Sequence, residues 1–144
     1  MDGLPVFGLF DFDKAYDNWN SLSDAMEKDD LIQGQVKKVA EHNAYGIMLP
    51  LPDDQKIRDQ VVKNLANNES FGGHSLCEIE HLFYGDELTA EFFSEQIAPG
   101  GGRKVVIKSD AKKEKFARDV IPMLDDKYFE VFKPMFEFVR SKIA

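Results

Sequence analysis

Two aspartates, Asp11 and Asp13, stand at the end of a short apolar run, and their spacing is suited to metal chemistry. The stretch 6–13 has the length and composition of a strand buried on both faces. Residues two apart in a strand point the same way, so both carboxylates are expected at the strand's carboxyl end. Such a pair resists ionising together unless a cation lies between them, and Mg²⁺ or Mn²⁺ prefers oxygen ligands. Alternatively, one aspartate caps the following helix and the other is solvated.

Two further groups of charged residues have the types that would complete such a site. Glu78 and Glu80 lie on a predicted helix over 76–84, with Glu80 beside its apolar stripe. Acids that hold a metal, together with a lysine that neutralises an oxyanion, are the parts of a phosphodiester-cleaving site. The second group is a cluster of three lysines where a later helix is predicted to begin, against the preference of the helix dipole: Lys112, Lys113 and Lys115. Both groups also have a plainer interpretation as charged residues on solvent-exposed faces of helices.

The elements that position these residues are predicted from the hydrophobic spacing. Apolar runs predict strands over 6–13, 45–52 and 104–108. The second strand must end or lie at a sheet edge near Pro50, which lacks a backbone donor. This alternation favours an α/β fold, a mainly parallel sheet flanked by helices, in one domain spanning 1–144. Helical spacing or capping residues predict the helices 31–42, 53–65, 76–84, 86–97, 110–121 and 125–144.

The composition narrows the classes of protein. The chain has 144 residues, of which 43% are hydrophobic and 31% charged, as is usual for a soluble globular domain. No apolar run approaches the ~20 residues of a membrane span, so we expect no membrane association. A single cysteine, Cys77, suits a reducing cytoplasm. The net charge of −8 argues against a broad basic face for nucleic acid, but it leaves room for a metal that bridges acids to a phosphate.

Three segments, taken together, resemble a known family. The segment 8–16 resembles the Asp-x-Asp strand end of TOPRIM domains, above all those at the C-termini of ATPase-linked nucleases of the overcoming-lysogenization-defect (OLD) family. Residues 79–83 are similar to the segment that carries a further metal-ligating acid there. Residues 113–117 resemble the lysine-containing helix start that follows. The resemblance implies a Mg²⁺- or Mn²⁺-dependent nuclease domain that cuts or nicks DNA, with a role in phage defence.

The resemblance also implies roles for single residues. Asp11 and Asp13 match the metal-binding pair. Glu80 matches the later acid, as a metal ligand and catalytic residue, with Glu78 as the alternative. Lys113 matches the catalytic lysine, and the other two lysines of its cluster are the alternatives.

One feature departs from the family pattern. TOPRIM domains carry a glutamate after an earlier strand, whereas here only Asp2 precedes the first predicted strand. From this we expect that the chain is the C-terminal part of a larger or split nuclease. Its activity would then need a partner chain that carries an ATPase and the missing glutamate.

Two rival interpretations remain open at the level of sequence. A phosphohydrolase of the haloacid-dehalogenase (HAD) type also has an apolar strand that ends in Asp-x-Asp, so Asp11 would be the nucleophile and Asp13 the acid/base. Ala15 departs from that family's motif. The other rival is a non-enzymatic, acidic interaction domain that binds a basic partner, which the net charge of −8 allows.

Overall fold

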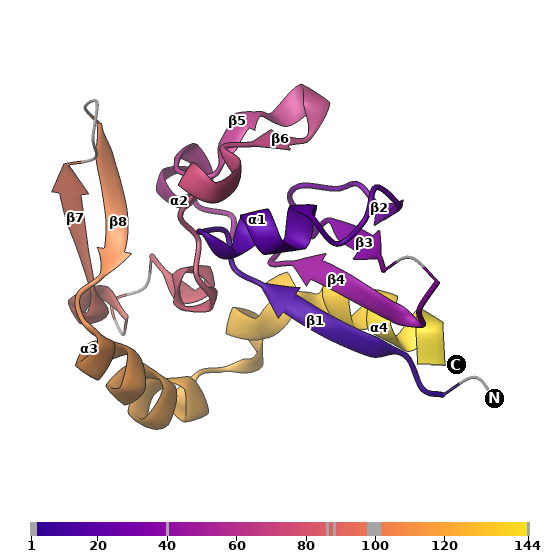
Figure 1. Cartoon of the computed structure of the whole chain (residues 1–144). Coiled ribbons are helices and arrows are strands. Elements are labelled where there is room, and N and C mark those ends of the chain that lie inside the picture. The colour runs from indigo at the N-terminus through magenta and orange to yellow at the C-terminus, as the bar shows by residue number, and fades with distance from the viewer. Residues whose placement is uncertain (1–2, 40, 86, 88, 98–101, 144) are drawn as a thin grey trace.

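The computed structural model describes residues 3–39, 41–85, 87, 89–97 and 102–143. Its main sheet has four strands in the order β1-β4-β3-β2, and two small antiparallel sheets lie beside it (Figure 1). Only β1 and β4 run parallel, while β3 is antiparallel to both β4 and β2. The strands of the main sheet are β1 (Val6–Phe10), β2 (Met26–Lys28), β3 (Val36–Lys38) and β4 (Ala44–Met48).

The prediction of a mainly parallel α/β sheet is therefore wrong. It depended on a helix over 31–42, which would have been the crossover between parallel strands. The chain instead turns at 31–33 and forms β3, which a short connection joins to β4. A connection of that length can join only antiparallel neighbours. The apolar residues of 31–39 fit a core-crossing turn and a short strand as well as they fit a helix, and spacing alone does not separate the two.

Of the two strands predicted to be buried, only the second is. Strand β1 lies at the edge of the sheet, and Val6 and Leu9 are 65% and 46% exposed, so it is not buried on both faces. Strand β4 is central, and its residues from Tyr45 to Met48 are buried. It ends two residues before Pro50, as the missing backbone donor of proline predicts.

Helices α1 (Ala15–Asn20) and α4 (Lys133–Ile143) cover opposite faces of the sheet. On one face, the buried Trp19 of α1 donates a hydrogen bond from its indole Nε1 to the carbonyl of Gly46, at 2.9 Å. On the other face, the Phe138 ring of α4 packs edge-on against Tyr45, with the ring centroids 5.6 Å apart. Because side chains alternate along a strand, residues 45 and 46 of β4 meet different helices. The sheet is thus anchored from both sides.

The rest of the chain forms short elements in which helical and extended segments alternate. The predicted helix 53–65 ends early, as α2 (Gln55–Asp59), and Asp54 rather than Asp53 caps it by accepting a bond from the Ile57 amide. The prediction of a helix over 86–97 is wrong for its last five residues, which form strand β7 after a short 3-10 helix, and residues 86 and 88 lie outside the described part of the chain. The small sheets pair β5 (Val62–Asn64) with β6 (Glu69–Ser70) and β7 (Phe93–Ile97) with β8 (Arg103–Ile107).

The remaining helices follow the sequence more closely in position than in type. The predicted helix 76–84 is the 3-10 helix η3 (Ile79–Phe83). The predicted helix from 110 is α3 (Asp110–Lys115), which continues as the π-helix η5 (Phe116–Val120). The last predicted helix is divided into the 3-10 helix η7 (Asp126–Phe132) and α4. The other short 3-10 helices are η1 (Leu65–Asn67), η2 (Gly72–His74), η4 (Ala90–Phe92) and η6 (Ile121–Met123).

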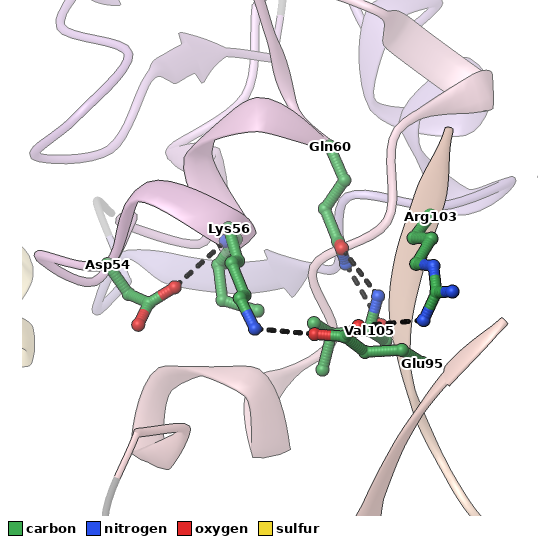
Figure 2. A network of polar contacts seen from close by, with 7 residues as sticks. Asp54, Lys56, Gln60, Glu95, Arg103 and Val105 are labelled. Atoms are coloured by element: carbon green, nitrogen blue, oxygen red, sulfur yellow. Dashed lines mark hydrogen bonds and ion pairs between the residues drawn. The ribbon is translucent and has the colours of Figure 1, made fainter. Parts of the chain in front are cut away.

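A polar network fastens the β7–β8 hairpin to α2 (Figure 2). The Gln60 side chain forms two bonds with the backbone of Val105: its Nε2 donates to the carbonyl at 3.0 Å, and its Oε1 accepts from the amide at 2.8 Å. At the surface, Glu95 forms ion pairs with both Lys56 and Arg103. The hairpin is therefore held by a buried amide bridge and an exposed ion cluster, and its strand β8 in turn positions η3.

Candidate functional site

The two aspartates of the candidate site flank a residue that locks the strand end in place. Phe12, between Asp11 and Asp13, is fully buried and forms an isolated antiparallel bridge with Cys77. The Phe12 amide donates to the Cys77 carbonyl at 2.9 Å, and the Cys77 amide donates to the Phe12 carbonyl at 2.8 Å. Because Phe12 points into the core, its two neighbours are directed away from it, and both are half-buried. One oxygen of Asp13 accepts a bond from the Ala15 amide, at the start of α1.

The same bridge brings the glutamates to the strand end, because Glu78 directly follows Cys77. A buried histidine fixes the helix η3 that starts there. The amide of Glu78 donates to His81 Nδ1 at 3.0 Å, which leaves His81 Nε2 as the donor to the Val105 carbonyl at 2.8 Å. Burial lowers the pKa of His81, so the ring stays neutral in this arrangement. Glu80, on the first turn of η3, is half-buried.

One lysine of the predicted cluster reaches the acids. Lys113, on α3, forms an ion pair with Glu78, and this hydrogen-bonded contact raises the pKa of Lys113. The other two lysines do not take this place: the Lys112 ammonium lies over the Phe92 ring, and Lys115 is exposed. Ser109 caps α3, since its Oγ accepts a hydrogen bond from the Lys112 amide. The cap fixes where the helix begins and therefore on which side of it Lys113 lies.

The causes of the pKa shift of Asp11 show that the charged residues predicted for the site lie close together. The pKa of Asp11 is raised to about 6, first by burial and then by the negative charges of Asp13, Glu78 and Glu80, while Lys113 opposes the shift. Four of the predicted charged residues thus act on the carboxyl group of Asp11, although the five come from three distant segments of the chain. A carboxyl group with a pKa near 6 can take up a proton at close to neutral pH. The four acids carry more negative charge than the one lysine neutralises.

This charge imbalance bears on the predicted metal. Carboxylate oxygens are the donors that Mg²⁺ and Mn²⁺ prefer, and a cation beside Asp11 would relieve the repulsion that raises its pKa. Within the described residues, however, no three His, Cys, Asp or Glu side chains are placed to hold one metal ion together. The residues therefore fit the ion in donor type and charge, and the coordination that they offer is that of a Mg²⁺ ion held by one or two carboxylates and keeping several waters.

Three residues that shape the site carry no sequence signal for that role. Cys77 supplies the backbone bridge, and burial raises the pKa of its thiol, so it acts here by packing. His81 orients η3, and Gln60 connects the same β8 strand to α2 through Val105. A histidine three residues after a glutamate and a glutamine at the end of a helix carry no signal of such roles, and only the tertiary contacts show what these two residues hold in place.

Among the described residues, no helix is long and apolar enough to span a bilayer.

Comparisons with known proteins identify no relative of this chain. No protein-family model, no curated protein and no solved structure matches the chain. The resemblance to TOPRIM nucleases therefore stays a prediction, and the site is interpreted from its own residues.

Proposed function

We propose that this chain carries a metal-dependent site for cleaving the phosphodiester bonds of DNA, centred on Asp11 and Asp13. Three segments of the chain meet at the end of β1, and this convergence supports the proposal. It is seen in the Phe12–Cys77 bridge, in the Glu78–Lys113 ion pair and in the effect of the neighbouring charges on the pKa of Asp11. The resemblance of the same segments to TOPRIM nucleases points to the same chemistry.

Each residue has a role that follows from its chemistry. Asp11 and Asp13 would hold Mg²⁺ or Mn²⁺ together with water ligands, and Glu80 would add negative charge beside them. The bound ion would polarise the phosphoryl oxygen and lower the pKa of a water ligand. Lys113, released from Glu78 when a phosphate enters, would donate to the oxyanion that develops in the transition state. Asp11, with its pKa near 6, can take up a proton when no cation is bound.

The negative charge of the chain defines how DNA would approach. With a net charge of −8, the phosphate backbone meets repulsion over most of the surface, so binding depends on the metal or on a basic partner chain. We therefore include in the proposal a partner polypeptide, such as an ATPase chain, that supplies DNA contacts and a further acid. A role in phage defence is part of the same proposal, through the resemblance alone.

Calorimetric titration with Mn²⁺ and Mg²⁺ tests the metal site. We expect saturable binding by the wild-type chain, weakened at least about tenfold in Asp11→Asn because a charged ligand is lost. Asp24→Asn, at an exposed aspartate outside the site, is the matched control and should bind as the wild type does. Weak, unsaturable uptake that is equal in all three proteins would overturn the metal site and favour the acidic interaction domain.

A nicking assay on supercoiled plasmid with Mn²⁺ tests the chemistry. If the chain acts alone, Lys113→Met should lower the rate by about 10²–10³, the usual loss when one oxyanion donor is removed. Lys115→Met, two residues along the same helix and exposed, should leave the rate unchanged. Cleavage that is insensitive to Lys113→Met would contradict the proposed role of the lysine. A covalent aspartyl-phosphate trapped on Asp11 would instead establish the HAD-type reaction.

A further inference from the structure

The outer edge of β1 presents backbone groups that no strand of the described chain pairs with. The Val6 amide donates to Asn43, and the Phe10 carbonyl accepts from Leu49, so these even-numbered residues direct their polar groups toward β4. Because the direction alternates along a strand, Phe7 and Leu9 direct theirs to the outer side. A free edge of this kind is a template for an added strand, and nothing blunts it: β1 contains no proline and no charged residue.

The same edge is apolar and continues into a groove. Leu9 is 46% exposed and lines a groove of about 450 Å³, within the ~300–1,000 Å³ range of ligand pockets. Apart from Leu9 and Glu80, the groove wall is formed by apolar side chains of η3, η5, η6, η7 and α4, among them Phe136, which is 55% exposed. Apolar surface of this kind, beside an unpaired strand, is typical of a site for another polypeptide.

The charge around the groove specifies the kind of polypeptide. Glu80 is the one charged residue in the groove wall, and its charge also acts on Asp11, two residues after Leu9. The groove therefore opens toward the acidic end of β1, where four carboxylates face a single lysine. A ligand that carries lysine or arginine at this end would complement the excess negative charge.

We infer that the outer edge of β1 and the adjoining groove bind an extended segment of another protein, with apolar residues at alternate positions and basic residues at its ends. The segment pairs with Phe7 and Leu9 as a fifth strand, its apolar side chains on the α4 face enter the groove, and a basic side chain lies near Glu80. This inference goes beyond the proposed cleavage and does not rest on it, because such binding needs no metal and no turnover.

A defined peptide tests this inference in metal-free buffer. The probe is a synthetic peptide in which five central residues alternate valine with threonine and two lysines stand at each end, and its matched control has glutamate in place of every lysine. We expect the lysine peptide to bind at least about tenfold more tightly, because the site is acidic. We also expect the amide protons of Phe7 and Leu9 to exchange at least about tenfold more slowly when it is bound.

Two leucine variants place the binding on the chain. Leu9→Lys should weaken binding of the lysine peptide at least about tenfold, while Leu65→Lys, at a similarly exposed leucine of η1, should not. Val6→Lys, at a residue that is 65% exposed, is a second edge variant in case Leu9→Lys does not fold.

Several outcomes would overturn the inference. They are no saturable binding up to about 1 mM peptide, equal binding of the glutamate peptide, or equal losses in the two leucine variants. Slow exchange at Phe7 and Leu9 in a concentrated sample without peptide, together with a dimer in sedimentation, would assign the edge to a second copy of the chain instead.

Discussion

Two polar regions meet on the helix η3, and they are built in opposite ways. On one side, the network around Val105 pairs each donor with an acceptor: Gln60 meets both backbone groups of Val105, and His81 adds a third bond. On the other side, Asp11 lies among three more carboxylates with one lysine to oppose them. The first region is neutral and buried, and the second is charged, half-buried and unbalanced.

The difference between the two regions separates support from function. A buried network with every group paired fixes one arrangement of the backbone. No described buried side-chain nitrogen or oxygen lacks a hydrogen-bond partner, so this condition holds through the described interior. Clustered like charges cost stability and persist where a ligand uses them. The contrast is therefore measurable: changes in the Val105 network should destabilise the fold, and neutralising the acidic cluster should stabilise it.

The largest change in the free energy of unfolding is expected from Gln60→Leu. The leucine fills a similar space but leaves the Val105 amide without its partner and removes the bonds from Gln60 to the carbonyls of Val105 and Leu76, and we expect a loss of about 3 kcal/mol in the free energy of unfolding. Denaturant unfolding followed by circular dichroism measures it. Gln55→Leu, on the same helix but exposed, is the matched control and should change stability little. Equal effects of the two substitutions would remove the distinction between the regions.

Asp11→Asn should act in the opposite direction. The folded pKa of Asp11 is about 6 and its ordinary value 3.8, so between these values the folded state binds more protons than the unfolded state. Ionised Asp11 therefore costs stability progressively as the pH rises through this window. With chelator present, we expect the variant to be more stable than the wild type by about 1–2 kcal/mol at about pH 7.5, and about equally stable below pH 3.8.

The pH dependence is what distinguishes this effect from ordinary packing. Thermal unfolding of both proteins across the pH window measures it, and Asp24→Asn, at an exposed site, should show no such gain. A gain in Asp11→Asn that is the same at both ends of the window would mean that charge repulsion is not its cause.

The smallest effect is expected at the surface ion cluster that lies beside the Val105 network. Lys56 pairs with Glu95 at 2.5 Å, but the Lys56 side chain is 62% exposed, and such surface pairs contribute little because solvent screens them. Lys56→Gln should leave the denaturation midpoint unchanged within error, with Lys63→Gln as the control at a second exposed ion pair. A clear loss at Lys56 alone would show that the surface ions, and not Gln60, hold the hairpin.

The sequence determined the ends of elements and the identity of the charged groups better than it determined the architecture. The proline at 50 predicted where β4 ends, and the apolar runs located β1, β4 and β8 to within a few residues. The spacing of Asp11 and Asp13 predicted their shared place at a strand end, and Glu80 and Lys113 were selected as their partners. These features are local, since each depends on the type of a single residue or on the alternation of side chains along a strand.

The topology of the sheet and the contacts between distant segments were decided only by the tertiary structure. The short apolar segment at 31–39 became a turn and a strand because β4 offered it an antiparallel edge, and the predicted parallel sheet was lost with the crossover helix. The backbone bridge between Phe12 and Cys77 and the ion pair between Lys113 and Glu78 join residues at least 35 positions apart. The pKa of Asp11 is raised by burial and, besides Asp13, by the distant Glu78 and Glu80. Hydrophobic spacing carries no information about such pairings, because they depend on which surfaces meet once the core has formed.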